Sequence, residues 1–161
     1  MSDLNEQQLG LLAESRIASV ATIDAGGFPH LTAVWFLYED DCLYLAIPSS
    51  SAKGRNLLQN PRIAIMVDAR VNYAECGLTA IGTAEIIKGD PAVPIVERLH
   101  KKYLSEPALA DPAVGPVFAA MDDWAVKLKP GRWISWDMAT LDAQVFGGGI
   151  SKNDYMKPIV P

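Results

Sequence analysis

Short runs of β-branched and small residues, each followed by a turn sequence, constrain the fold of this chain more than any other feature. Residues 17–23 read Ile-Ala-Ser-Val-Ala-Thr-Ile and lead into Asp24-Ala25-Gly26-Gly27, whose glycines suit the positive φ angles of a hairpin. Connections of this length join antiparallel neighbours, so the first three strands are predicted to form a meander. The predicted strands cover residues 17–23, Pro29–Tyr38, Cys42–Ile47, Arg62–Asp68, Leu78–Ile87, Trp124–Leu128 and Arg132–Met138.

Helices are expected at the N-terminus and between some of these strands. Ser2 or Asp3 can cap a first helix that ends near Glu14, because short polar side chains accept hydrogen bonds from the free N–H groups of a helix start. The remaining predicted helices cover Ala52–Gln59, Pro91–Leu104 and, with an interruption at Gly115-Pro116, Ala113–Met121.

These elements predict a mainly β protein with minor α content. About six to seven antiparallel strands with a helical insertion before the last pair favour a closed or partly closed β-barrel, which would leave no exposed strand edge. Gly82 interrupts a long strand, so a bulge or a barrel corner is expected there. We assign residues 1–140 to one domain and residues 141–161 to a C-terminal tail or arm, mobile or laid on a partner.

Composition excludes several classes of partner. Lys and Arg number 14 against 19 Asp and Glu, and the net charge of −5 has the wrong sign for broad binding of nucleic acid or anionic membrane. The N-terminus carries no basic segment followed by an apolar one, and no uncharged apolar run is long enough to cross a membrane. We therefore expect a soluble, cytoplasmic protein in which Cys42 and Cys76 are reduced.

Most familiar catalytic arrangements are missing from the sequence. His30 and His100 are the two histidines, and without paired cysteines or a His-Glu-x-x-His motif they do not predict a metal site. There is no Gly-x-Ser-x-Gly elbow of a serine hydrolase, and no Gly-x-Gly-x-x-Gly motif of a nicotinamide coenzyme site.

One segment predicts an anion site in an otherwise acidic protein. Ser49, Ser50 and Ser51 supply hydroxyl groups at a helix start, where backbone N–H groups are also free, and Lys53 and Arg55 add two cations. A single phosphate would fit there. The alternative is a plain serine cap followed by solvated basic residues.

Tryptophans provide a second candidate feature. Trp133 and Trp136 are three residues apart on the last predicted strand and so face opposite sides of it. One of them can pack inward while the other covers a ligand or a second subunit, unless both belong to the core or to a dimer interface.

The order of several short segments resembles the pyridoxamine 5′-phosphate oxidase-like superfamily of flavin-binding split β-barrels, which includes a deazaflavin-dependent branch. The resemblance extends over about residues 11–137 and rests on the ordered series at consistent spacing. The segments are residues 18–24 (Ala-Ser-Val-Ala-Thr-Ile-Asp), 27–30 (Gly-Phe-Pro-His), 33–36 (Ala-Val-Trp-Phe), 51–57 (Ser-Ala-Lys-Gly-Arg-Asn-Leu), 60–62 (Asn-Pro-Arg) and 82–85 (Gly-Thr-Ala-Glu).

This resemblance implies an antiparallel split β-barrel that forms a homodimer and binds flavin mononucleotide (FMN) at the subunit interface. The strand along the isoalloxazine ring corresponds to Thr32, Ala33, Val34 and Trp35. The Ser-x-Lys that binds the phosphate corresponds to Ser51 and Lys53, within the anion site Ser49, Ser50, Ser51, Lys53 and Arg55. Trp133 or Trp136 of the partner subunit is expected to cover the cofactor.

The chain also departs from the pattern of the authentic oxidases. They carry arginines at the positions of Thr32 and Ala52 and a glutamine near Gly77, and their substrate-binding arginine and histidine have no clear counterpart on the last strand. Oxidation of pyridoxamine phosphate is therefore not expected. Loss of these polar contacts weakens FMN binding or leaves room for a deazaflavin coenzyme.

Three functions remain open at this level. The first is an FMN-dependent oxidoreductase acting on a small-molecule substrate or electron donor, in which the protein orients the cofactor and excludes water. The second is a deazaflavin-dependent reductase. The third is a flavin or tetrapyrrole carrier, or a sensor, without turnover. No catalytic side chain is identified, and His30 and Tyr73 are the two candidates for testing.

Overall fold

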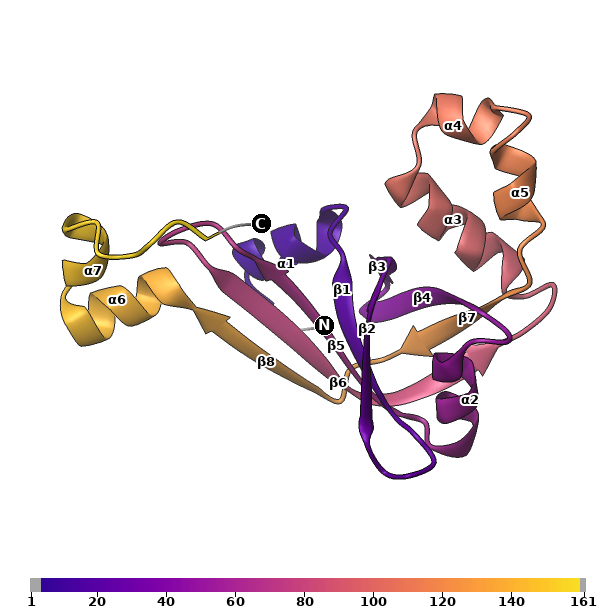
Figure 1. Ribbon diagram of the computed structural model, residues 1–161, viewed down its shortest axis with the longest axis horizontal. Helices are drawn as coiled ribbons and strands as arrows, with labels where there is room; N and C mark the ends of the chain where they lie inside the picture. The colour runs from indigo at the N-terminus through magenta and orange to yellow at the C-terminus, as the bar shows by residue number, and fades with distance from the viewer. Residues whose placement is uncertain (1–3, 160–161) are drawn as a thin grey trace.

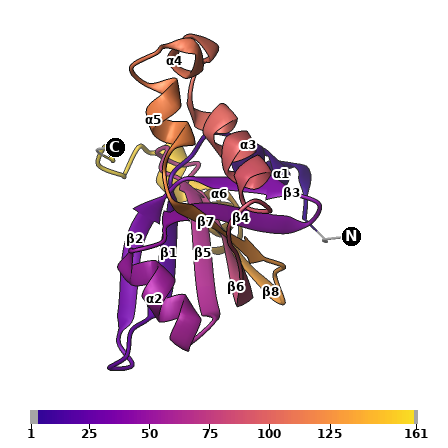
Figure 2. The ribbon, with the colours of Figure 1, turned by 90° about the vertical axis from the view of Figure 1, so that its right-hand side faces the viewer.

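The computed structural model describes residues 4–159 (Figures 1 and 2). Its strands are β1 (Ala18–Ile23), β2 (Pro29–Val34), β3 (Phe36–Glu39), β4 (Cys42–Pro48), β5 (Arg62–Ala69), β6 (Cys76–Ile87), β7 (Asp123–Leu128) and β8 (Arg132–Asp137). Its helices are α1 (Glu6–Ala13), α2 (Ala52–Gln59), α3 (Val93–Tyr103), α4 (Glu106–Ala110), α5 (Gly115–Ala119), α6 (Met138–Phe146) and α7 (Gly149–Lys152).

The strands form a split barrel, and every strand pair is antiparallel. The order is β2-β1-β5-β6-β7-β4-β3, with β8 attached to β6 beside this path. The path begins at β2 and ends at β3, which follow each other in the chain with Trp35 between them, so the backbone itself closes the circuit. The mainly β fold class and the barrel are thus confirmed, with eight strands in the described part of the chain.

The predicted continuous strand Pro29–Tyr38 is wrong, because the chain breaks at Trp35 into β2 and β3. The Tyr103 hydroxyl accepts a hydrogen bond from the Phe36 amide at 3.1 Å and lies 3.2 Å from the Phe36 carbonyl, so a side chain of α3 takes the place of a ladder partner. As a result β2 pairs with β1 and β3 pairs with β4, and the three segments do not form one meander.

Gly82 marks the corner that the sequence predicts in β6. Up to Ile81 this strand has β8 on one side, and from Ala84 it has β7 there instead, while β5 pairs with it as far as Thr83. A Cβ atom at Gly82 would lie 2.9 Å from the Leu128 side chain, so the strand can bend closely over β7 only without a side chain.

The barrel interior is filled by the inward faces of the strands and covered at one side by α1. Asn5 caps α1 in a reciprocal capping box with Gln8, so the cap lies later than predicted, while Ser2 and Asp3 lie outside the described residues. Cys42 and Cys76 are buried free thiols. The largest fully buried side chains are Leu12, Val20, Phe36, Leu43, Leu45, Ile47, Ile65, Val67, Leu78, Leu99, Val126 and Leu128.

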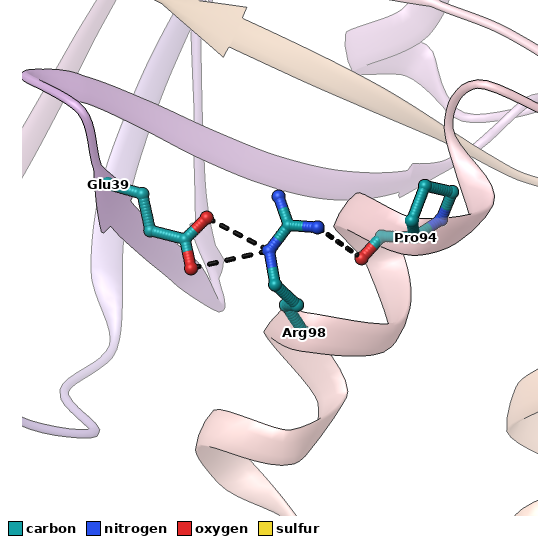
Figure 3. Close-up of polar contacts among 3 residues, drawn as sticks. All are labelled: Glu39, Pro94 and Arg98. Atoms are coloured by element: carbon teal, nitrogen blue, oxygen red, sulfur yellow. Dashed lines mark hydrogen bonds and ion pairs between the residues drawn. The ribbon is translucent and has the colours of Figure 1, made fainter.

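Helices α3, α4 and α5 form the insertion between β6 and β7 and lie at one end of the barrel (Figure 1). Arg98 of α3 donates to the Glu39 carboxylate at 3.0 Å and to the Pro94 carbonyl at 2.9 Å, which ties α3 to β3 (Figure 3). Gly115-Pro116 begins α5 rather than interrupting a longer helix, because proline is tolerated in the first turn.

Three strands each keep one unpaired edge, so the expectation that the barrel exposes no edge is wrong. Within the described residues β2 pairs with β1 alone, β3 with β4 alone and β8 with β6 alone. On the outer face of β8, Ile134 and Trp136 remain 46% and 41% exposed. The physical reason is that β7 takes the rest of the β6 edge, which leaves β8 outside the closed circuit.

The segment after β8 is helical where the sequence predicts a tail. Asp137 caps α6, and the chain then returns to the loop between β5 and β6. There the Tyr73 hydroxyl is hydrogen-bonded to Asp154, and Asn72 bonds to the backbone of Lys157 and Ile159 at 3.1 and 2.8 Å. None of the helices within residues 4–159 is both long and apolar enough to cross a membrane.

Candidate functional site

Helix α2 has the predicted bounds and the predicted cap. The Ser51 hydroxyl accepts a hydrogen bond from the Gly54 amide at 3.1 Å, and the buried Asn56 amide donates to the Thr22 hydroxyl of β1 at 3.0 Å. Gly54 lies against the ring of Trp124 on β7, where an added Cβ would come within 3.2 Å of the indole. The helix start is therefore held in place from two sides of the barrel.

Two cations accompany this helix start. Lys53 is half-buried, its burial lowers the pKa of its amine, and it makes no ion pair or hydrogen bond with another residue of the described chain. The Arg55 guanidinium donates to the Ser50 carbonyl at 2.6 Å, which folds the side chain back over the serines. An amine without a partner beside free backbone N–H groups can receive an anion.

The serines are not equally available to such an anion. The Ser49 hydroxyl donates to the Asp122 carboxylate, and the Ser49 amide donates to the Asp122 carbonyl at 2.9 Å. Ser49 is therefore already engaged, and the Asp122 carboxylate that it contacts adds a negative charge near the helix start. Ser51 is engaged as the cap, while Ser50 is exposed.

A cavity of about 470 Å³ lies next to this segment, between the ends of β2 and β4 and the helices α3 and α5. The Trp35 ring forms part of its wall and stacks on Tyr103 at 4.7 Å between centroids, and on Phe118 at 6.2 Å. The full lining is Ile17, Ala33, Val34, Trp35, Ala46, Pro48, Leu99, His100, Phe118, Met121 and Asp123. Its volume and apolar walls are typical of a small-molecule site.

His100 and Asp123 are the two titratable groups in this lining. Burial lowers the pKa of the His100 imidazole, and the neighbouring carboxylates of Asp123 and Glu97 oppose that shift. Burial raises the pKa of the Asp123 carboxyl, while His100 acts in the opposite direction. The difference between the pKa values of the two groups is therefore smaller than it is in water.

Three of the four residues predicted to hold the flavin ring line this cavity, namely Ala33, Val34 and Trp35. Thr32 does not: it pairs with the buried Val20, and its hydroxyl oxygen is buried without a hydrogen-bond partner in the described chain. Pro48, which immediately precedes the predicted phosphate segment, also lines the cavity. The cavity therefore extends from the predicted ring strand to the residue directly before the predicted phosphate segment.

The predicted tryptophans lie elsewhere in this protomer, on β8. Trp133 packs against the barrel core and meets Tyr38 edge to face at 6.4 Å, whereas Trp136 is exposed and covers Gly77. The two rings thus face opposite sides, as their spacing predicts, and neither lines the cavity. His30 and Tyr73 do not line it either.

Sequence reasoning missed the acidic pair Asp122 and Asp123 and the α3 residue His100. Asp122 is separated from Ser49 by 73 positions, and only the pairing of β4 with β7 brings them together. The sequence offered one signal for these residues. Two adjacent aspartates without an assigned role stand directly before a strand in which polar and apolar residues alternate.

A second, larger cavity of about 710 Å³ lies on the outer face of β1, β5 and β6. Its polar groups are used within the fold. Asp24 accepts from the amides of Gly26 and Phe28 at 2.8 and 2.9 Å, and the Arg62 guanidinium donates to the Asn60 side chain at 3.1 Å. Asp24 and Arg62 of this lining thus make hydrogen bonds within the fold.

The residues present fit a flavin in two respects. The cavity walls suit its ring, and one cation suits its phosphate. Aromatic and aliphatic walls suit a planar ring, and the unpaired edge of β2 offers backbone groups to a polar ring edge. Lys53 is the fitting phosphate contact. The fit is poorer at Ser49, where the Asp122 carboxylate opposes a second negative charge.

Comparisons with known proteins agree with this fold. The conserved hypothetical protein Rv2991 from Mycobacterium tuberculosis shares 24% identity, covers 86% of this chain and 88% of its own, and superposes with a TM-score of 0.66. An F420 reductase shares 24% identity over 81% of this chain and 98% of its own, with a TM-score of 0.61. HutZ, the heme storage protein from Vibrio cholerae, shares 18% identity over 84% and 95%, with a TM-score of 0.64.

No curated protein sequence matches this chain significantly. The three structural likenesses establish the split-barrel fold. The family model for pyridoxamine 5′-phosphate oxidase matches residues 4–133, which is well over half of the chain. The chain therefore belongs to the pyridoxamine 5′-phosphate oxidase family.

Proposed function

We propose that this chain is an FMN-binding oxidoreductase that holds its cofactor at the interface of a homodimer. One observation carries the proposal: a single apolar cavity runs from Ala33–Trp35 on β2 to Pro48, and the anion segment Ser49–Arg55 follows directly. A ring in this cavity and a phosphate at the start of α2 would thus be joined by a short tail. Family membership supports the same cofactor class.

In this proposal each group has a defined task. The end of β2 presents backbone groups to the ring, and Trp35, braced by Tyr103 and Phe118, supplies a rigid aromatic wall that excludes water. Lys53 and the N–H groups at the start of α2 bind the phosphate, with Arg55 close by. When bound, the flavin supplies the hydride or electron transfer.

The substrate of this proposed enzyme is not pyridoxamine phosphate. Thr32 and Ala52 stand where the authentic oxidases carry arginines, and the cavity lining contains no Lys or Arg within the described residues. A phosphorylated substrate in the cavity would meet the Asp123 carboxylate rather than a cation. An uncharged small molecule suits these walls better.

Dimer formation is supported by the outer face of β8. Its free edge and the exposed side chains of Ile134 and Trp136 are features that a second copy of the chain would cover. In such a dimer Trp136 of the partner subunit, or Trp133, is the proposed cover of the cofactor.

A deazaflavin-dependent reductase is the second candidate, and the Ser49–Asp122 contact favours it. A phosphomonoester such as FMN carries nearly two negative charges, whereas the phosphodiester of a deazaflavin coenzyme carries one, so the Asp122 carboxylate repels the diester less. The F420 reductase among the structural neighbours shares the fold.

The deciding experiment is an absorption spectrum of the purified protein, followed by mass spectrometry of whatever denaturation releases. Flavin bands with release of FMN support the proposal. A colourless protein that takes up a deazaflavin in preference to FMN supports the second candidate. A protein that takes up neither, or only a tetrapyrrole, overturns both, and light scattering on the same sample tests the dimer.

A further inference from the structure

The cavity beside Trp35 has an unusual charge pattern for a flavin site. Of the residues that line it, two can carry charge, His100 from α3 and Asp123 from β7. All the other lining side chains are apolar or aromatic, apart from the indole N–H of Trp35. Inside the described cavity there is thus an acid and a base but no permanent cation.

Charges outside the lining do not reverse this pattern. Glu97, on the helix of His100, and Asp122, next to Asp123, add negative charge. Lys101 lines a separate, smaller groove with Glu97 on the other side of the His100 ring. Lys53 lies at the phosphate end, where a bound phosphate would neutralise it.

The remaining charges on the elements packed around α3 are engaged elsewhere. Glu39 on β3 is paired with Arg98, and Lys127 on β7 lies opposite Tyr44 of β4 in the strand register. Lys102, one turn along α3, donates to the Leu12 carbonyl at 2.9 Å and lies over the ring of Phe36. The Tyr103 hydroxyl is bonded to the Arg16 carbonyl at 2.5 Å.

A ring bound in this cavity would therefore meet a carboxylate, without a cation to balance a negative charge on the ring. In a partly desolvated site, two like charges at contact distance cost several kcal/mol at an effective dielectric constant of about 20. An uncharged ring avoids this cost and can hydrogen-bond with the imidazole and the carboxylate.

We propose that His100 and Asp123 keep the ring bound in this cavity uncharged, and that reduction of the bound flavin consequently takes up a proton in addition to the hydride. This rests on the proposed function. A hydride donor would transfer two electrons and one proton, together as hydride, and would leave the ring anionic. The second proton, drawn from solvent through the His100–Asp123 pair, neutralises that charge.

The pair is suited to this transfer. A buried imidazole with a lowered pKa beside a half-buried carboxyl with a raised pKa can exchange a proton, because their proton affinities are closer than usual. His100 is held in place by Phe118, whose ring it meets edge to face at 5.0 Å, and Asp123 by its pairing with Pro48.

The first test measures the midpoint potential of bound FMN against pH in a spectroelectrochemical titration. Each proton taken up by a two-electron couple contributes about 29.6 mV per pH unit. The wild type is expected to give about 59 mV per pH unit above neutral pH, where free reduced flavin loses a proton, and Asp123→Asn about 30 mV. The matched control Glu85→Gln, an exposed carboxylate on β6, keeps the wild-type slope.

A wild-type slope of about 30 mV per pH unit would overturn the proposal while leaving the FMN oxidoreductase intact. His100→Gln serves as a second variant and is also expected to lower the slope. Circular dichroism confirms that each variant is folded before its potential is measured.

The second test needs no flavin. Calorimetric titration of the flavin-free protein compares 2-naphthol, an uncharged two-ring probe, with 2-naphthoate, its anionic counterpart. The wild type is expected to bind the naphthol at least about tenfold more tightly, and Asp123→Asn to remove most of that difference. Equal binding of both probes by the wild type overturns the proposal. If the protein takes up no FMN but still binds the naphthol more tightly than the naphthoate, the result supports the selectivity of the cavity. It then refutes only the proposed function.

Discussion

Asp122 holds Ser49 at both ends, with its carboxylate bound to the Ser49 hydroxyl and its main-chain carbonyl bound to the Ser49 amide. This contact joins the residue directly before β7 to the start of the segment between β4 and α2. It also places a carboxylate close to the segment that, by the family resemblance, is expected to bind a phosphate. The acid lowers the affinity of this helix start for anions.

Asp122→Asn is therefore expected to tighten the binding of FMN. The exposed carboxylate is screened by solvent, so the gain should be about 0.2 to 1 kcal/mol, or up to about fivefold in the dissociation constant. Fluorescence titration of flavin-free protein measures it at low salt. Weaker binding by the variant would mean that Asp122 supports the phosphate segment through structure more than it repels the phosphate.

Lys53→Ala tests the cation that has no partner within the described chain. Loss of a charge-assisted contact to phosphate is expected to weaken FMN binding by about 1.5 to 3 kcal/mol. Lys129→Ala removes an exposed lysine from the turn between β7 and β8 and serves as the matched control. Unchanged affinity of the Lys53 variant in the same titration would remove this residue from the site.

Gly77→Ala tests the packing between β6 and β8. An added Cβ would lie 2.7 Å from the Cε2 atom of Trp136, so the indole must leave its position. We expect a loss of about 1 to 3 kcal/mol in the free energy of unfolding in urea and a red shift of tryptophan emission. Gly10→Ala, in α1 with open space around it, is the contrasting substitution and should stabilise by up to about 1 kcal/mol.

His100→Gln tests the buried imidazole through the pH dependence of stability. Burial holds the folded pKa of His100 below the ordinary value of 6.5. As the pH falls through 6.5 the unfolded chain takes up a proton that the folded chain refuses, so this group makes the wild type less stable on acidification.

The variant should lose that contribution. Urea unfolding at about pH 7 and about pH 5 should show a smaller fall in stability for His100→Gln than for wild type. Asp123 contributes with the opposite sign, since its raised folded pKa favours the folded state on acidification. A steeper fall for the variant would contradict the assignment of His100 as a buried base.

Local patterns in the sequence predict most elements of this fold. The bounds of α2 are correct because Ser51 at its start and Asn60-Pro61 after its end are local signals that nothing in the tertiary structure overrides. The break at Trp35 was not predictable in the same way, because it depends on the Tyr103 hydroxyl, which is supplied from 67 residues beyond Phe36. The free edge of β8 depends likewise on how β7 pairs with β6.

In the candidate site, too, local signals predict some residues, whereas long-range packing determines the others. The serines, Lys53 and the end of β2 lie close to each other in sequence or on predicted neighbouring elements. In the structure the end of β2 lines the cavity, and the segment with the serines and Lys53 begins directly after Pro48, which also lines it. His100 comes from the α3 insertion, whose packing no periodicity specifies, and Asp123 follows that insertion as the first residue of β7. Thr32 could not be excluded from the cavity by its alternation alone, because the chain changes direction within three residues of it.

The barrel has two halves, one containing β1, β2 and β5 and the other containing β3, β4 and β7. The halves are joined where β2 continues into β3 through Trp35, and by β6, which pairs with β5 in one half and with β7 in the other. Neither half can therefore be removed as a self-contained module, because each would lose strands that the other half also requires. Chemical denaturation of the barrel should accordingly proceed in one all-or-none transition, with circular dichroism and tryptophan emission changing together. A helix as remote as α3 shares in that cooperativity, since its Tyr103 hydroxyl is bonded to the backbone at Phe36, directly after the junction at Trp35.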